Sequence, residues 1–215
     1  SYLYHVRPAA DLAEKIASIA PPGLTKTFFG NSGAESIEAA LKLARLYTGR
    51  HEFIALEAGF HGRTWGALSI SGNSNRKRGG GPYAPGVAFA PLPDAYRARM
   101  RDNPEVLGLE CAQALEDVIR FATSGDVAAF VAEPVLGEGG IIVPPPNYFR
   151  EAKKILDRHG ILFIADEVQS GFARTGKMFA IEHFGVAPDI LVTAKGIADG
   201  LPLAAMTTRP EIAAA

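Results

Sequence analysis

Cysteine is nearly absent from this sequence of 215 residues, which contains Cys111 alone. One thiol cannot form a disulfide within the chain, so a disulfide-stapled secreted fold is excluded and a reducing, cytoplasmic location is expected. Long uncharged apolar runs are also missing, which argues against a transmembrane helix, and no secretory pattern opens the chain. The five histidines have no metal-ligand spacing, so we expect no metal site.

An excess of charge of either sign is absent as well. The 22 basic and 23 acidic residues give a net charge of −1, so we expect neither nucleic acid nor a membrane surface as a partner. Hydrophobic residues make up 47% of the chain, enough to bury one sizeable core in a single domain. The chain does not begin with methionine and Ala213–Ala215 carry no helix stop signal, so we expect residues 1–215 to be a truncated piece.

Short β-rich runs alternate with helical periodicity along the chain, which predicts a three-layer α/β/α fold with a mostly parallel sheet. Most of these runs are apolar without alternation, as in strands covered on both faces. We expect seven strands, at Thr25–Phe29, Glu52–Glu57, Val87–Ala90, Val127–Glu133, Leu162–Asp166, Ile190–Ala194 and Ala204–Thr207. The clearest helices are expected at about Asp11–Ile19, Gly33–Thr48, Ala112–Thr123 and Asn147–His159. Residues 72–86, rich in glycine and proline, predict a long loop that is functional, held against a partner subunit, or flexible.

The motif Asn31-Ser32-Gly33-Ala34-Glu35 lies between the first expected strand and the clearest helix. Backbone N–H groups at a helix N-terminus attract anions, and a glycine in the first turn lets a phosphate approach closely. Ser32 and Glu35 also have the spacing of a capping box, so helix capping alone is the alternative interpretation.

Asp166 and Lys195 each close an apolar run, LFIAD at 162–166 and ILVTAK at 190–195. A lysine for the aldehyde and an aspartate for the ring nitrogen are what a pyridoxal phosphate site requires. If the chain stays extended beyond Asp166, Val168 lies on the same face and can pack against the ring. A solvated lysine, and an aspartate that caps the strand end or pairs with an arginine, are the alternatives.

Two further motifs follow expected strands. In Phe60-His61-Gly62-Arg63-Thr64, Phe60 is suited to stack on the other face of the cofactor and Arg63 to bind a substrate carboxylate, unless it is an ordinary surface arginine. In residues 133–140 (EPVLGEGG), Glu133 and Glu138 could form a glycosidase pair, but the surrounding proline and glycines indicate a shaped loop.

Residues 171–177 (GFARTGK) match the spacing of a nucleotide-binding phosphate loop. Met178 stands where that motif needs a serine or threonine to hold magnesium, and Gly185 and Pro188 leave room for only a short helix. Nucleotide binding is therefore the least favoured alternative.

In this order, NSGAE, FHGRT, AEPVLGEGG, ADEVQSGFARTGK and TAKG resemble the class III aminotransferases, pyridoxal phosphate enzymes of fold type I. The resemblance extends from about Leu12 to Pro210. It implies ping-pong transfer of an amino group from an amino or ω-amino acid to a keto acid, and the motifs look closest to 4-aminobutyrate or alanine–glyoxylate members. Aminomutases and a decarboxylase share these motifs and remain alternatives, ahead of a non-catalytic α/β module.

The resemblance also implies roles for individual residues. Lys195 would bind pyridoxal phosphate covalently and later carry the proton at the substrate carbon, with its amine buried near a cation. Asp166 would pair with the ring nitrogen. The other cofactor-binding residues would be Ser32, Gly33, Ala34, Phe60, His61, Val168 and Gln169. The substrate-binding residues would be Arg63, Glu133 and Glu138, the last as a gate that pairs with an arginine further along in the family.

Members of this family are longer and form homodimers whose phosphate site takes a threonine from the neighbouring subunit. The resemblance therefore implies that residues 1–215 are the cofactor-binding large domain of a homodimer, without an N-terminal segment and a C-terminal small domain. It follows that this chain alone would be catalytically incompetent and would bind the cofactor weakly if at all.

Overall fold

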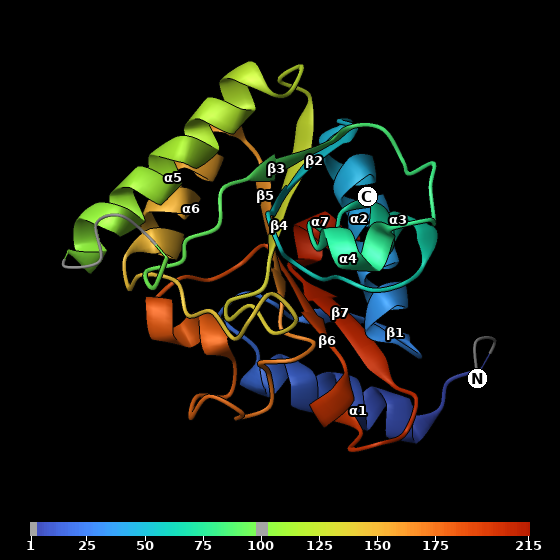
Figure 1. Cartoon of the computed structure of the whole chain (residues 1–215). Helices are drawn as coiled ribbons and strands as arrows, with labels where there is room; N and C mark the ends of the chain where they lie inside the picture. Colours follow the sequence, from blue (N-terminus) through green and yellow to red (C-terminus); the bar gives the residue numbers. More distant parts are fainter. Residues whose placement is uncertain (1–3, 98–102) are drawn as a thin grey trace.

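The computed structural model describes residues 4–97 and 103–215, which form a seven-stranded sheet with helices on both faces (Figure 1). The strands are β1 (Lys26–Gly30), β2 (Glu52–Leu56), β3 (Val87–Ala90), β4 (Val127–Ala132), β5 (Leu162–Asp166), β6 (Ile190–Thr193) and β7 (Ala204–Thr208). The α-helices are α1 (Arg7–Ile19), α2 (Gly33–Thr48), α3 (Trp65–Ser69), α4 (Ser74–Lys77), α5 (Pro104–Phe121), α6 (Tyr148–His159) and α7 (Pro210–Ala213). Two 3-10 helices are η1 (Ala180–Phe184) and η2 (Lys195–Ile197). None of the helices in the described ranges is long and apolar enough to cross a membrane.

The sheet confirms the seven strands expected, with each end shifted by at most one residue, and α2 has the predicted bounds. The helix α5 begins eight residues earlier than expected. Its start is an asparagine cap followed by proline: the Asn103 side chain accepts a hydrogen bond from the Val106 N–H at 3.2 Å. The short helices α3, α4 and α7 were not predicted, and α4 lies within the expected loop 72–86.

The strand order is β1-β7-β6-β5-β4-β2-β3, and the pairs among β3, β2, β4, β5 and β6 are parallel. Strand β7 is antiparallel to both of its neighbours, β1 and β6. Two reversals restore the direction, so β1 runs the same way as β6. The carboxyl ends of β1, β2, β4, β5 and β6 therefore meet at one edge of the sheet, where ligands of open α/β sheets bind.

Each face of the sheet carries its own apolar core, because neighbouring strand residues point to opposite sides. Phe130 and Phe163 pack with α5 and α6 on one face. Val131 and Ile164 pack with α2, α3 and α7 on the other. All four of these side chains are buried, which explains the continuous apolar runs in the sequence and confirms the three-layer architecture.

Candidate active site

The predicted site residues meet in a pocket at the carboxyl edge of the sheet. The pocket has a volume of about 540 Å³. The residues that line it are Asn31, Ser32, Gly33, Ala34, Phe60, His61, Gly62, Arg63, Thr64, Glu133, Asp166, Val168, Gln169, Ala194, Lys195, Leu201 and Leu203. Of the residues predicted from the sequence, only Glu138 is not part of this lining.

The N-terminus of α2 forms one wall of the pocket. Ser32 Oγ accepts a hydrogen bond from the Glu35 N–H at 3.2 Å, as a helix cap should. The capping box is incomplete, because the Glu35 carboxylate accepts the Asn31 N–H at 2.6 Å instead of the N–H of Ser32. The N–H groups of Gly33 and Ala34 have no acceptor within the helix. Together with the positive end of the helix dipole, they make this wall suitable for an anion.

Gly33 also determines how closely the N-terminus of α2 approaches the loop after β5. A Cβ atom at this position would lie 2.8 Å from Val168 Cγ2, closer than carbon atoms can pack. The absence of a side chain therefore lets the helix N-terminus lie directly against Val168.

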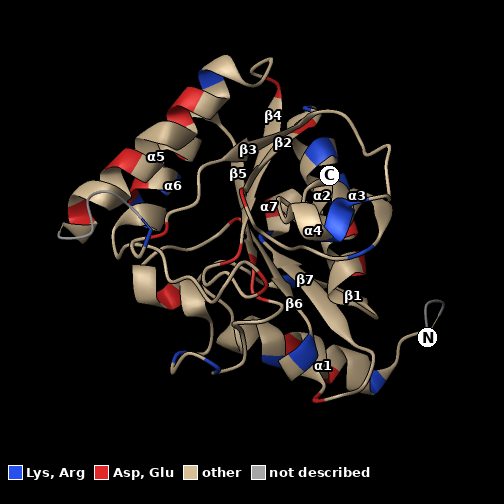
Figure 2. Ribbon diagram, viewed as in Figure 1, with Lys and Arg blue, Asp and Glu red and all other residues tan. Residues whose placement is uncertain are grey.

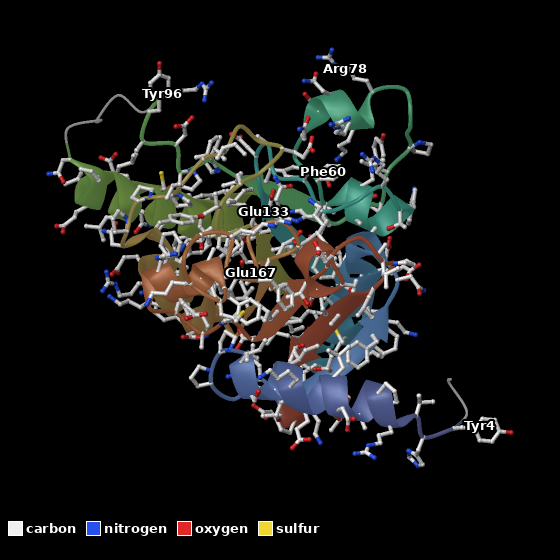
Figure 3. The ribbon with its side chains drawn as sticks, turned by 90° about the horizontal axis from the view of Figure 1, so that it is seen from below. Tyr4, Phe60, Arg78, Tyr96, Glu133 and Glu167 are labelled. Carbon is white, nitrogen blue, oxygen red and sulfur yellow. The ribbon has the colours of Figure 1, made fainter. Side chains whose placement is uncertain are left out.

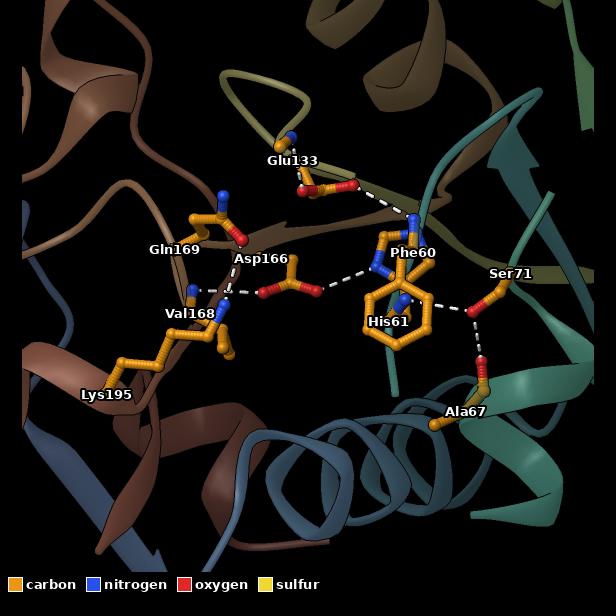
Figure 4. Close-up of polar contacts among 10 residues, drawn as sticks. Phe60, His61, Ala67, Ser71, Glu133, Asp166, Val168, Gln169 and Lys195 are labelled. Carbon is orange, nitrogen blue, oxygen red and sulfur yellow. Dashed lines mark hydrogen bonds and ion pairs between the residues drawn. The ribbon is translucent and has the colours of Figure 1, made fainter. Parts of the chain in front are cut away.

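Asp166 is the last residue of β5 and only 3% of its surface is exposed. Its Oδ1 accepts the Val168 N–H at 3.0 Å, and its Oδ2 lies 2.7 Å from His61 Nδ1 (Figure 4). The chain therefore turns after Asp166 and does not stay extended to Val168. The turn still brings both side chains into the same pocket.

His61 is buried behind this carboxylate and holds it in place. Because the carboxylate can only accept, Nδ1 of the ring must carry the hydrogen. The backbone N–H of His61 donates to Ser71 Oγ at 2.9 Å. Burial by itself lowers the pKa of His61, but the hydrogen bond to Asp166 and the charges of Asp166 and Glu133 outweigh it, so the pKa lies above its ordinary value.

Glu133 follows β4 and ties two loops of the site together. Its Oε1 accepts the Phe60 N–H at 3.0 Å, and its Oε2 accepts the Gly137 N–H at 2.9 Å (Figure 4). Burial raises the pKa of this carboxyl group, although the nearby His61 opposes the shift. With both oxygens bound to backbone N–H groups, Glu133 is a loop anchor, which speaks against the glycosidase interpretation.

Glu38 is a site residue that the sequence analysis missed. Its Oε1 accepts three hydrogen bonds, from Thr64 Oγ1 at 2.6 Å, the Gly66 N–H at 2.8 Å and the Ala67 N–H at 3.1 Å. It thereby caps α3, whose own N-cap residue Thr64 makes no side-chain cap. The loop 60–64 is thus fixed at its start by Glu133 and at its end by Glu38. The signals for this contact in the sequence were weak: an acidic residue within α2, and Gly66 shortly after the motif at residues 60–64.

Lys195 follows β6 and begins η2 with a φ of 49°. This left-handed conformation is costly for a residue with a side chain and is concentrated at functional sites. Its Nζ donates a hydrogen bond to Gln169 Oε1 at 2.8 Å (Figure 4). Lys195 is exposed in this chain, and burial of its amine once cofactor and substrate are bound stays a prediction.

Glu138 lies outside the pocket lining and is paired. Its Oε2 lies 2.6 Å from a terminal nitrogen of Arg76. The guanidinium of Arg76 holds the pKa of Glu138 below its usual value, and the charges of Lys195 and Arg63 add to this effect. The resemblance implied that Glu138 pairs with an arginine that lies later in the sequence of family members. Within residues 1–215 its partner is Arg76.

Residues 171–177 do not form a phosphate loop. They pass through turns into η1, and no α-helix follows Lys177 in the described part of the chain before Pro210. Phe172 and Ala173 instead adopt φ values of 58° and 65°. Within residues 4–97 and 103–215, no group of three or more His, Cys, Asp or Glu is placed to hold a metal ion.

Comparisons with known proteins support the family that the sequence motifs resemble. The model of the family "Aminotransferase class-III" matches residues 1–215. The chain is 42% identical to the acetylornithine aminotransferase of Methanopyrus kandleri, over all of this chain and 50% of that protein. It is 43% identical to the leucine/methionine racemase of Thermococcus litoralis, over 94% of this chain and 46% of that protein.

Among solved structures, the amine transaminase of an uncultivated Pseudomonas species, in its PLP-bound form, matches all of this chain and 50% of its own. The TM-score is 0.93 and the sequence identity is 38%. The chain therefore has the fold of this transaminase and spans about half the length of the proteins it matches.

Proposed function

Because the chain belongs to the class III aminotransferase family, we propose that the protein transfers an amino group from an amino or ω-amino acid to a keto acid with pyridoxal 5'-phosphate as cofactor. The observation that carries the proposal is the meeting of Lys195, Asp166 and the α2 N-terminus in one pocket. These groups come from three separate strand ends and supply an amine, a carboxylate and an anion site.

The residues of the pocket fit this cofactor. The N–H groups of Gly33 and Ala34, with the Ser32 hydroxyl, would hold the phosphate. The dipole of α2 contributes only about 0.3–2 kcal/mol, so it positions the phosphate and needs a further anchor. Lys195 would provide that anchor, its amine binding the cofactor aldehyde covalently with loss of water. When bound, the cofactor supplies an aldehyde that captures the amine and a ring that takes up electrons from the substrate carbon.

The side chains around Asp166 would orient the ring. Asp166 would pair with the ring nitrogen and keep it protonated, while His61 holds the carboxylate from behind. Val168 and Phe60 would pack against the ring. Gln169 Oε1, which accepts a hydrogen bond from Lys195 Nζ, would contact the ring hydroxyl.

Lys195 Nζ and Arg63 would act on the substrate. Lys195 Nζ would take the proton from the carbon that bears the amino group and return a proton on the cofactor side. Arg63 is exposed at the pocket and has no hydrogen bond or ion pair within residues 4–97 and 103–215. Its planar fork is therefore available to a substrate carboxylate. Glu133 would keep Phe60 in place through its backbone N–H and stand near the substrate.

We also propose that residues 1–215 are the cofactor-binding domain and that the protein acts as a homodimer in the cytoplasm with an active site shared between subunits. The single cysteine and the family relationship support this proposal. Sedimentation of the protein expressed from its complete coding sequence tests it: a dimer is expected, and a monomer with full activity contradicts it.

The activity is tested with that same protein, loaded with pyridoxal phosphate. A panel of amino donors, including 4-aminobutyrate, L-alanine and N-acetylornithine, is incubated with 2-oxoglutarate, pyruvate or glyoxylate. We expect amino-group transfer with parallel double-reciprocal plots, the pattern of ping-pong kinetics. No transfer from any donor would contradict the proposal.

Racemisation is the second candidate, because one relative of 43% identity is a leucine/methionine racemase. Racemisation needs no keto acid as amino-group acceptor. Loss of optical rotation of L-leucine or L-methionine without any keto acid would favour racemisation. Aminomutase or decarboxylase activity would appear in the same mixtures as an isomer of the donor or as released carbon dioxide.

A further inference from the structure

Glu167 is a buried carboxylate that the proposed reaction does not use. It directly follows Asp166 in the chain, and its exposed fraction is 0%. Figure 3 shows it in the interior of the molecule, as is Glu133, whereas Arg78 and Tyr96 lie at the edge. A carboxylate is costly to bury unless its oxygens are bonded, so the partners of Glu167 indicate its role.

The carboxylate of Glu167 bonds to both ends of the segment 170–181. Its Oε1 accepts the Ile181 N–H at 2.7 Å, and its Oε2 accepts a hydrogen bond from the Ser170 hydroxyl. Burial raises the pKa of this carboxyl group, and the hydrogen bonds oppose that shift. One side chain therefore holds the beginning and the end of this segment together.

The backbone of Glu167 adds bonds in two directions. Its carbonyl oxygen accepts the Gly171 N–H at 3.0 Å, which closes a turn. Its own N–H donates to the Val192 carbonyl in β6 at 2.8 Å. Since β6 is the strand that leads to Lys195, Glu167 fixes the turn relative to the strand that carries the lysine.

Gln169 lies within this turn, directly before Ser170. Its Oε1 accepts a hydrogen bond from Lys195 Nζ at 2.8 Å, which is the one hydrogen bond of that amine in the described part of the chain. The Gln169 carboxamide also lies against Gly137, where a Cβ atom would collide with it. The place of this carboxamide therefore sets the direction of the lysine amine.

Val168, the other pocket residue of the turn, is held by different groups. Its N–H donates to Asp166 Oδ1 at 3.0 Å, and its side chain packs against Gly33 at the start of α2. Loss of the Glu167 carboxylate should therefore displace Gln169 and leave Val168 in place.

We propose that Glu167 is a positioning residue that holds Gln169 through Ser170 and thereby directs the Lys195 amine at the cofactor aldehyde. This inference rests on the proposed function. In the step concerned, the nitrogen of the neutral amine bonds to the aldehyde carbon, and the aldehyde oxygen leaves as water with the two amine hydrogens. A misdirected amine reaches the aldehyde less often, so capture of the cofactor becomes slower.

The test is the rate at which Lys195 captures pyridoxal phosphate, measured on protein from its complete coding sequence after the cofactor has been removed. Borohydride added at set times reduces the bond formed, and peptide mass analysis gives the labelled fraction of Lys195. Ser170→Ala removes one bond to Glu167 and leaves that of Ile181, so it should slow capture by about three- to tenfold. Glu167→Met removes both and should slow capture by about ten- to a hundredfold.

Two further variants separate positioning from a general loss of stability. Glu167→Gln keeps an acceptor for the Ile181 N–H and an amide that can donate to Ser170 Oγ, so it should retain the wild-type capture rate. In a Gln169→Met background, Ser170→Ala should cause no further slowing, because the path through Gln169 is already cut. General damage to the fold would instead slow capture by the same factor in both backgrounds.

Glu116→Met is the matched control for the loss of a buried carboxylate. Glu116 is 3% exposed and belongs to α5, a helix that carries several acidic residues (Figure 2). Its oxygens bond to Arg158 at 2.8 Å and to His159 at 2.9 Å, and it is not among the residues that line the pocket. Its loss should lower the thermal stability and leave the capture rate unchanged.

Four outcomes would overturn the proposal: unchanged capture in Ser170→Ala and Glu167→Met, equal slowing by Ser170→Ala with and without Gln169→Met, a Glu167→Gln variant as slow as Glu167→Met, or the same slowing in Glu116→Met. If Glu167→Met does not fold, Ser170→Ala and its combination with Gln169→Met decide. If the wild-type protein captures no pyridoxal phosphate on Lys195, the proposed function itself fails, and this inference with it.

Discussion

The contact between His61 and Asp166 gives the most exact prediction about the interior of the site. Phenylalanine in place of His61 keeps an aromatic ring but removes the Nδ1 donor that lies 2.7 Å from Asp166 Oδ2. Asp166 is only 3% exposed, so water cannot replace that donor. Breaking a buried charged pair costs about 3–5 kcal/mol. Since Oδ1 keeps the Val168 N–H at 3.0 Å, we expect the lower end, about 3 kcal/mol.

The assay is urea denaturation followed by circular dichroism, before cofactor is added, because the cofactor would give Asp166 a new partner. His61→Phe should lower the free energy of unfolding by about 3 kcal/mol at pH 6. Ser71→Ala is the control: it removes the acceptor of the His61 backbone N–H and the donor to the Ala67 carbonyl, and it should cost about 1–3 kcal/mol, by the same amount at every pH.

The pH dependence gives the same pair a second test. The pKa of His61 is raised in the folded protein, chiefly by its bond to Asp166 against the opposing effect of burial. The charged pair therefore contributes fully below the ordinary histidine pKa and less as pH rises through the raised value. The neutral imidazole still donates its Nδ1–H to Asp166. Above the raised pKa, the wild type should therefore keep part of its extra free energy of unfolding over His61→Phe. A loss under 1 kcal/mol, or an advantage that grows with pH, would refute this reasoning.

Two further predictions concern the α2 helix. Gly33→Ala should destabilise the protein by about 1–3 kcal/mol and weaken pyridoxal phosphate binding, because its Cβ would lie 2.8 Å from Val168 Cγ2. Thermal unfolding and a cofactor titration measure this. Val168→Ala in the same chain should recover part of the lost stability by relieving that contact, and no recovery of stability would contradict it. Glu38→Ala removes the cap of α3 and should cost about 1–2 kcal/mol while raising KM for carboxylated donors through misplacement of Arg63. An unchanged KM would show that Glu38 serves stability alone.

The sheet could be predicted because its strands are covered on both faces. In β4 and β5, for example, every residue is buried, so the sequence there is an unbroken apolar run. The short helix α3 could not be predicted, because its cap comes from Glu38, 28 residues before Gly66 in the chain. A tertiary hydrogen bond stabilises it, and local sequence does not contain that information.

The same distinction holds within the site. Lys195, Asp166 and the α2 N-terminus could be predicted because each follows a strand and carries its own chemistry. The partner of Asp166 could not, since His61 lies 105 residues away and only the sheet order brings β2 and β5 to one edge. Arg76 was missed for a similar reason: the sequence placed it in a loop, and its partner Glu138 is 62 residues further along.

The central claim is that Lys195 binds pyridoxal phosphate in the pocket beside Asp166. Its most direct test is borohydride reduction of the cofactor-loaded protein from its complete coding sequence, followed by peptide mass analysis. The account predicts a pyridoxyl group on Lys195, and its disappearance in Lys195→Ala. A pyridoxyl group on another lysine, or none at all, would contradict it.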